Sequence, residues 1–262
     1  MAINSVSDVP AFVLHSRAYR DTSAIVELFT ETQGRVTVVA RGVKSAKCRY
    51  RGILQPFQPL LVSWSGRGEM FTLSSAEEAG LPHALLGQRL VVGLYVNELL
   101  MRSLGKGDSH SEVYSSYKRL LISLAGSAAN NIASEHEQAL RFFEIDLLSE
   151  LGYGLILDHD VESGEAINTE EYYLYHPARG PVQVDDDSVA VSNMEVAVSG
   201  ETLQALAQGL SLNKDQLRYA KRLLRKTLVY HLGDKPLRSR RLFQSFRSEK
   251  SMAIEQEIQN DN

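Results

Sequence analysis

Five short β-like runs occupy the first part of the chain, and this density of strands most constrains the fold. The runs are AFVLHSR, TSAIVELFTE, GRVTVVARG, ILQPFQPLLVSW and EMFTLSSAE. They are rich in β-branched and aromatic residues, and turn signals such as Gln33-Gly34 separate them, with no helical period in between. Such a series predicts a small closed or nearly closed β-barrel. Because proline cannot donate to a strand ladder, Pro56 and Pro59 predict a bulge or an edge in the fourth run.

After Pro82 the apolar residues recur at helical spacing. This spacing predicts helices at about 85–105, 111–125, 135–151, 201–210 and 214–232. The segment from about 155 to 200 is acidic around short β-like pieces such as EYYLYH, and we expect it to be mostly solvated surface. The sequence therefore predicts an α+β protein. Its expected domains are a barrel over residues 1–79 and a mainly helical domain over residues 80–262, with an irregular acidic insert at about 155–200.

Composition excludes several classes of protein. Hydrophobic residues make up 44% of the 262 residues and charged residues 23%, which is typical of a globular chain rather than a disordered one. No apolar run is long enough to span a bilayer, and the start MAINSVSDVP lacks the basic and apolar segments of a signal peptide. The single cysteine, Cys48, favours a reducing compartment. We therefore expect a cytoplasmic protein that does not bind membranes.

The stretch GRVTVVARGVKSAKCRYRG, residues 34–52, joins an alternating strand to a basic loop. The alternation places Val36, Val38 and Ala40 on one face, for a core, and Arg35 and Arg41 on the other. Cations with an aromatic residue among them suit single-stranded DNA, because the charges follow the phosphates and a ring can stack a base. The alternative is a solvated loop kept charged for solubility. The candidate DNA-binding residues here are Arg35, Arg41, Lys44, Lys47, Arg49, Tyr50 and Arg51.

Charge is distributed unevenly along the chain. Residues 8–75 carry nine Lys and Arg against five acids, whereas the remainder has a net charge of −8. A second basic patch covers residues 214–241, which hold ten bases and two acids. This patch is either a second contact for a polyanion or a surface helix whose cations are balanced by the acidic body. Its candidate DNA-binding residues are Arg222, Arg225 and Lys226.

Sequence patterns for catalysis are absent. There is no phosphate-binding G-x-x-x-x-G-K-[ST] loop, and after His136-Glu137 the second histidine of a zinc-protease helix is replaced by Leu140. The seven histidines are scattered, without a cysteine at metal-ligand spacing. We therefore expect no enzyme and no cofactor. A nuclease, the remaining enzymatic alternative, would need clustered carboxylates around a divalent metal.

Several separated motifs resemble the bacterial RecO family of recombination mediators. These are VLHSRAYRDTSAIVELFTETQGRVTVVARGVKS, LQPFQPLLVSWSGRGEMFTL, LYVNELL, RFFEIDLLSELGYG and GDKPLRSRRLF, between about residues 8 and 247. The resemblance implies an oligonucleotide-binding (OB) fold barrel before the helical domain. It also implies a nucleoid-associated protein of the RecFOR pathway of DNA repair. Such a protein binds single- and double-stranded DNA, anneals complementary strands and, with RecR, promotes RecA loading on strands coated by single-stranded-DNA-binding protein (SSB).

The resemblance further implies a docking site for SSB, which in this family ends in an acidic tail with an apolar tip. A cation beside an apolar groove would suit that tail. Arg141 is the only base of the 135–151 helix and lies between apolar residues, so the candidate partner-binding residues are Arg141, Leu140 and Phe143. The alternative is a salt bridge of Arg141 with Glu137 or Glu144 within the helix.

Many relatives in this family carry a four-cysteine zinc site in the middle of the helical domain, and this chain departs from that pattern. It has no cysteine in that region, and His159 and His176 alone cannot form a closed structural site. We therefore expect no zinc and a segment held by packing.

The competing functional class is a protein-binding adaptor that makes no direct contact with DNA.

Overall fold

Two compact units make up the chain, residues 1–125 together with 236–262, and residues 126–235. The computed structural model describes residues 4–45, 48, 50, 52–68, 70–126, 132–184 and 194–239. Residues 80–125 thus share a unit with the barrel. The domain boundary that the sequence predicts between residues 79 and 80 stays a prediction. Among the described residues, no helix has the length and apolar character needed to cross a membrane.

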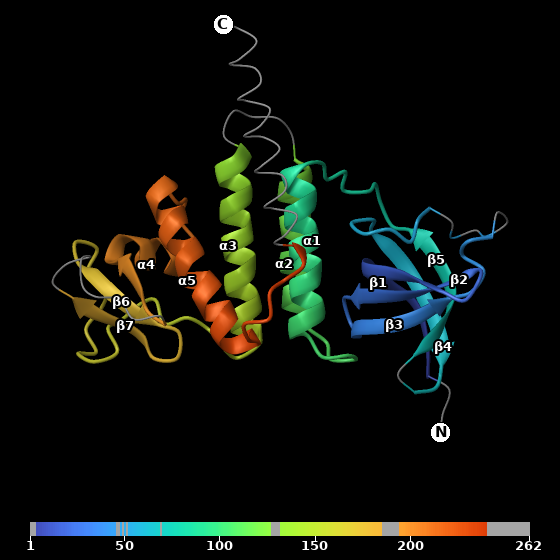
Figure 1. Ribbon diagram of the computed structural model, residues 1–262, viewed down its shortest axis with the longest axis horizontal. Helices are drawn as coiled ribbons and strands as arrows, with labels where there is room; N and C mark the ends of the chain where they lie inside the picture. Colours follow the sequence, from blue (N-terminus) through green and yellow to red (C-terminus); the bar gives the residue numbers. More distant parts are fainter. Residues whose placement is uncertain are drawn as a thin grey trace, which may run out of the picture. The chain divides into compact units, whose positions relative to one another are not determined.

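A closed barrel forms the N-terminal part of the first unit (Figure 1). Parallel pairing of Val38 with Phe71 and of Val39 with Thr72 closes it, whereas the other neighbouring strands are antiparallel. The expected OB-like barrel followed by helices is confirmed. In spatial order the strands are β1 (Asn4–Tyr19), β2 (Ser23–Thr30), β3 (Gly34–Ala40), β5 (Phe71–Glu78) and β4 (Leu60–Gly66).

The fourth strand is shorter than the sequence predicts. β4 begins at Leu60, directly after Pro59, and Pro56 makes only an isolated bridge with Val13. Without an N–H group, the prolines end the ladder instead of forming a bulge inside it. Residues 53–59 therefore form an irregular connection to the barrel.

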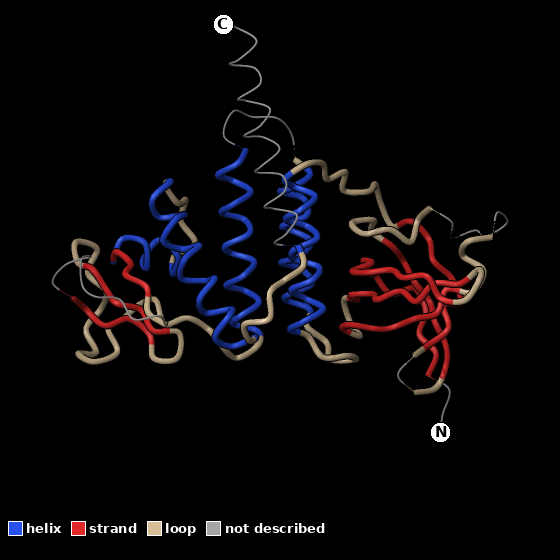
Figure 2. Tube along the Cα trace, in the orientation of Figure 1, coloured by secondary structure: helices blue, strands red, loops and turns tan. Residues whose placement is uncertain are grey.

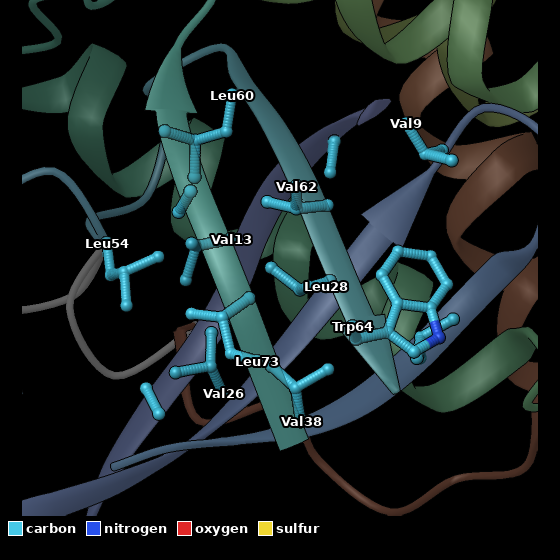
Figure 3. Close-up of a cluster of buried hydrophobic side chains, with 14 of the residues drawn as sticks. Val9, Val13, Val26, Leu28, Val38, Leu54, Leu60, Val62, Trp64 and Leu73 are labelled. Carbon is cyan, nitrogen blue, oxygen red and sulfur yellow. The ribbon is translucent and has the colours of Figure 1, made fainter. Parts of the chain in front are cut away.

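The interior of the barrel is one apolar cluster to which all of its strands contribute (Figure 3). Val13, Val26, Val38 and Trp64 come from separate strands and point toward one another in the close-up, and each is 2% exposed or less. Full burial of a side chain such as valine stabilises a fold by about 1.5–3 kcal/mol. The predicted core face of β3 is confirmed, because Val36, Val38 and Ala40 are all buried.

Helices α1 (Gln88–Ser103) and α2 (Ser111–Ala125) belong to the same unit as the barrel. Rings of α2 pack on rings of the barrel: the centroids of Phe12 and Tyr117 are 5.3 Å apart, and those of Phe29 and Tyr114 are 5.4 Å apart. Such aromatic pairs add stabilisation beyond their buried area. Part of the outer surface of β1 and β2 is therefore covered by a helix.

A buried polar bridge ties β1, α1 and α2 together at Asn97, which is 2% exposed. The register of β1 with β2 shifts between Val13 and His15, which leaves Leu14 as an extra residue. Asn97 Nδ2 donates to the Leu14 carbonyl at 3.0 Å, and its Oδ1 accepts from the Tyr117 hydroxyl at 2.7 Å. The Asn97 amide thus supplies a hydrogen-bond donor to the Leu14 carbonyl, which the irregular ladder leaves without a partner.

The second unit combines helices with a small antiparallel sheet (Figure 2). Helices α3 and α5 contact each other, and α4 and α5 pack on β8. The predicted helices are present, and EYYLYH coincides with β6. The elements are α3 (Ile132–Glu150), β6 (Tyr172–His176), β7 (Gly180–Val184), β8 (Val196–Ser199), α4 (Gly200–Ala207) and α5 (Lys214–Leu232), with the sheet in the order β7-β6-β8.

The acidic segment is not uniformly solvated, because Asp160 is only 3% exposed. Its carboxylate accepts backbone N–H groups of Glu162 at 2.7 Å, Ser163 at 2.8 Å and Gln183 at 2.5 Å. Burial alone would raise the pKa of Asp160, but these three donors together hold that pKa below its ordinary value. Through these hydrogen bonds, Asp160 connects its own loop to β7. The acidic run at residues 185–187 lies outside the described residues.

We expect Asn97→Leu to destabilise the first unit, because the Leu14 carbonyl would lose its donor inside the protein. An unsatisfied buried group of this kind costs about 1–3 kcal/mol. Urea denaturation gives the loss in free energy of unfolding. Ser103→Ala, at a half-buried position on the same helix, is the control and should cost less. Equal effects of the two substitutions would contradict a special role for Asn97.

The stabilisation from Asp160 should depend on pH. Its pKa is lowered in the folded state, so its contribution is fully present above the unfolded value of about 3.9 and is lost as pH falls through the folded value. Asp160→Asn should therefore be less stable than wild type near pH 7, and this difference should shrink below about pH 4. Denaturation at several pH values measures it, with the exposed Glu165→Gln as control. A difference that does not vary with pH would contradict this role.

Candidate nucleic-acid interface

The β1–β2 turn and the segment that follows β3 lie side by side at one end of the barrel. Ala24 pairs with Ala40, and the Lys44 N–H donates to the Thr22 carbonyl at 2.9 Å. The side chains near this contact are basic and exposed, and none has an ion pair to another described residue. We call them the barrel cations: Arg17, Arg20, Arg41 and Lys44.

Strand alternation accounts for the direction of these charges. Val38 and Ala40 point into the core, so Val39 and Arg41 point outward. Ile25 pairs with both Val39 and Arg17, which places Arg17 on the same outer face. The Arg20 guanidinium lies 5.1 Å from the ring centroid of Tyr19. The exposed Asp21 is the only acid of this turn, so the surface keeps a positive balance.

The sequence alone does not indicate Arg17 and Arg20 as site residues. Both contribute to the excess of bases in residues 8–75, but they lie in a different run from Arg41 and Lys44. Only the antiparallel pairing of β1, β2 and β3 brings the two segments together. The excess of bases in residues 8–75 indicates a basic surface, but the strand pairing that brings these four residues together cannot be inferred from that excess.

Arg35 has partners within its own unit, so we leave it out of this surface, and its role as a phosphate contact stays a prediction. Its Nη1 donates to the Met101 carbonyl at the end of α1, and its Nε lies 3.9 Å from Glu27 Oε2. The loop between the two helices also approaches closely: a Cβ on Gly34 would lie 1.7 Å from the Asp108 carbonyl oxygen. The even alternation of β3 predicts an open face, but a helix end and a loop cover its first residue.

Tyr50 is also engaged within the barrel, although the sequence suggests it as a stacking residue. Its hydroxyl donates to the Ser74 carbonyl at 2.6 Å, and its ring packs against the barrel core. We therefore leave Tyr50 out of the proposed interface. Lys47, Arg49 and Arg51 lie outside the described residues and stay predictions.

The second basic patch is divided between external and internal roles. Arg222 and Arg225 are exposed on α5 and have no ion pair to another described residue. Lys226 instead donates to the Glu195 carbonyl at 2.5 Å, and Lys221 pairs with Glu137 at 2.9 Å. Internal partners thus account for Lys221 and Lys226, whereas a polyanion contact stays a prediction for Arg222 and Arg225.

The KPLRSRR segment does not continue this helix into one surface. Residues from Pro236 onward belong to the first unit. There the Glu98 carboxylate accepts the backbone N–H groups of Arg238 at 2.7 Å and Ser239 at 2.9 Å. Burial alone would raise the pKa of Glu98, but these hydrogen bonds lower it. The basic patch of residues 214–241 is thus two separate features.

The predicted SSB-docking residues are interior residues of the second unit. Arg141 is 5% exposed, Leu140 6% and Phe143 1%, and Arg141 Nη1 lies 2.9 Å from Glu144 Oε2. The salt bridge with Glu144 is therefore the alternative that the structure supports, while Glu137 pairs with α5. A buried, paired guanidinium offers no cation beside an open groove, and we leave these three residues out of the proposed interface.

The two histidines considered as metal ligands have other partners. His159 Nδ1 lies 2.7 Å from Asp158 Oδ1, and His176 Nδ1 accepts the Ala178 N–H at 3.1 Å. The hydrogen bond from His159 lowers the pKa of the exposed Asp158. Within the part of the chain that the structure describes, no three His, Cys, Asp or Glu side chains gather closely enough to hold a metal ion.

Comparisons with known proteins agree with this architecture. The family model described as "Recombination protein O N terminal" matches residues 5–81, and "Recombination protein O C terminal" matches residues 87–241. Three similar proteins are each named DNA repair protein RecO. The one from Nitrosococcus oceani is 45% identical and the alignment covers 91% of this chain and 93% of the relative. The one from Nitrosospira multiformis is 43% identical, and the alignment covers 90% of this chain and 94% of the relative. The one from Sodalis glossinidius is 44% identical, and the alignment covers 90% of this chain and 86% of the relative. The chain belongs to the RecO family.

Proposed function

We propose that this protein binds DNA through the barrel cations and anneals complementary single strands during recombinational DNA repair. The observation that carries this proposal is the gathering of Arg17, Arg20, Arg41 and Lys44 at one end of an OB-like barrel. Exposed cations without internal ion pairs are available to phosphates. The names of the relatives, which are DNA repair proteins, support the same class of function.

Annealing by such a surface needs no bond to be made or broken by the protein. Two complementary strands repel each other through their phosphates, and cations held at a fixed surface reduce this repulsion. Base pairing then supplies the driving force. The protein acts as a binding platform in this mechanism, and we assign it no catalytic step.

Two separate basic surfaces serve annealing better than one, because each can hold a strand. Arg222 and Arg225 on α5 are the candidates for the second surface, since both are exposed and unpaired among the described residues. Double-stranded DNA, the product, would contact the same cations. We further propose action with RecR in promoting RecA loading on SSB-coated strands, at the nucleoid in the cytoplasm. These partners rest on the resemblance to the family.

Reversal of charge at the barrel cations should weaken binding to single strands of any sequence. Four contacts at about −0.7 each predict a slope of log affinity against log salt near −3. The double variant Arg41→Glu, Lys44→Glu should bind more weakly, with a slope about half as steep. Fluorescence anisotropy of a labelled oligonucleotide at several salt concentrations measures both quantities.

The matched control for this experiment is Lys106→Glu with Lys118→Glu. Both lysines are exposed in the same unit, and the control changes the net charge by the same amount. It should keep the wild-type slope. Equal slopes for both double variants would rule out the barrel cations as the site, and a wild-type protein that binds no oligonucleotide at low salt would favour the adaptor function.

Reversal of charge on α5 should impair annealing more than binding of one strand. Arg222→Glu with Arg225→Glu removes the proposed second surface but leaves the barrel cations intact. The annealing rate of two labelled strands, with and without SSB and at two ionic strengths, gives the first quantity, and anisotropy gives the second. Lys214→Glu with Arg218→Glu, at the start of the same helix, is the control. Equal loss of annealing and binding would indicate a single continuous site instead.

A further inference from the structure

Four aromatic rings meet in the second unit, at the C-terminal end of α5. Tyr153 stacks on His231 with centroids 4.2 Å apart and planes at 16°. Tyr230 meets His231 edge-on at 4.9 Å, and His176 meets Tyr230 edge-on at 5.9 Å. We call these four residues the aromatic cluster. None of these four residues takes part in the proposed function.

Three separate elements hold the rings of the aromatic cluster in place. Gly152, with a φ of +80°, ends α3, and the next residue, Tyr153, donates its N–H to the Leu148 carbonyl at 2.8 Å. His176 is the last residue of β6, and Tyr230 and His231 lie in the last turn of α5. The rings are therefore held by a helix end, a strand end and a helix, and not by a long loop.

The exposure of these rings is unusual for this protein. Tyr153 is 41% exposed and Tyr230 is 42% exposed. Among the large hydrophobic side chains that are exposed in the described ranges, these two are the only aromatic ones. Elsewhere in the second unit, rings such as Tyr173 and Tyr175 are 2% exposed or less. Among the described residues, Tyr153 and Tyr230 thus leave more ring surface in contact with solvent than the buried rings of this unit do.

Cations occur on the same elements as the exposed rings. On α5, Arg222, Lys226 and Tyr230 recur at intervals of four residues and share one face, so Tyr230 follows Arg222 by about 12 Å along the helix axis. Arg179 is exposed on the turn after β6, where its N–H donates to the His176 carbonyl at 3.0 Å. The acids closest in sequence are Glu150, three residues before Tyr153, and Asp234, three residues after His231, and both are exposed.

We propose that the aromatic cluster stacks bases of a single-stranded nucleic acid whose phosphates are held by the exposed cations of α5. This inference rests on the proposed function and deepens it, because it adds a base-contacting part to the second surface. Every base has a π-face, so the contact requires no particular sequence. It also explains why ring surface and unpaired cations occur together on one helix. The ligand must offer both negative charge and flat rings, as unpaired strands do and duplexes do not.

Removal of the two exposed rings should weaken binding without changing its dependence on salt. Loss of one stacked base costs a factor of about five or more in affinity, and no phosphate contact is removed. Tyr153→Ala with Tyr230→Ala should therefore bind a single-stranded oligonucleotide at least about fivefold more weakly, with the wild-type salt slope. Tyr153→Phe with Tyr230→Phe keeps both rings and should bind as wild type does. A 2-aminopurine base in the oligonucleotide should report the loss of stacking through brighter emission.

Controls separate this inference from its alternatives. Leu210→Ala removes an exposed apolar side chain of the same unit and should leave affinity unchanged. If the alanine variant melts at a lower temperature than wild type, Tyr230→Leu preserves packing without a π-face and should still bind more weakly. Wild-type affinity in the alanine and leucine variants would overturn the stacking role and leave the proposed function intact. Absence of oligonucleotide binding by the wild-type protein would overturn both.

Discussion

The alternation of side chains along β3 determines which side of the barrel wall its basic side chains occupy. The closed barrel buries Val36, Val38 and Ala40, which forces the residues between and after them to the outside. A shift of register by one residue would exchange the two faces, so the apolar core holds the outward direction of Arg41 firmly. The basic surface is thus a consequence of packing inside the barrel.

The outer face of β3 is then divided between structure and function. Its first residue, Arg35, contacts the end of α1 and lies against the α1–α2 loop, and the neighbouring Thr37 is 5% exposed. Its other end continues into Arg41 and Lys44, which are exposed beside the β1–β2 turn. The helices of this unit therefore leave one end of the barrel open.

Internal partners distinguish the cations that hold the fold from those available to a ligand. Arg141 is buried against Glu144, and Lys226 reaches a backbone carbonyl near β8. Removing water from such groups is costly, and the internal partner offsets this cost. Arg222 and Arg225 have no such partner among the described residues and keep their hydration. A polyanion would compete only with water and salt for them.

The sequence alone predicts the barrel, the helices and the two basic regions, because periodicity and charge are local properties. It does not predict that Arg35 and Tyr50 have internal partners, since these partners lie on α1 and β5. For Arg141 the sequence offers the salt bridge with Glu144 only as an alternative, because the burial of that side chain depends on the interior of the second unit. It also misses Arg17, whose neighbours are set by strand pairing. The contact of Tyr153 with His231 joins residues far apart in the chain, and no local pattern indicates it.

We propose that nucleic acid contacts two separate surfaces, the open end of the barrel and the exposed face of α5. Photo-crosslinking of the wild-type protein to an oligonucleotide that contains 4-thiothymidine, followed by mass spectrometry of the peptides, locates these contacts. We expect crosslinks within residues 17–23, 40–45 and 222–231. Crosslinks confined to other segments, such as α1 and β4, would contradict it.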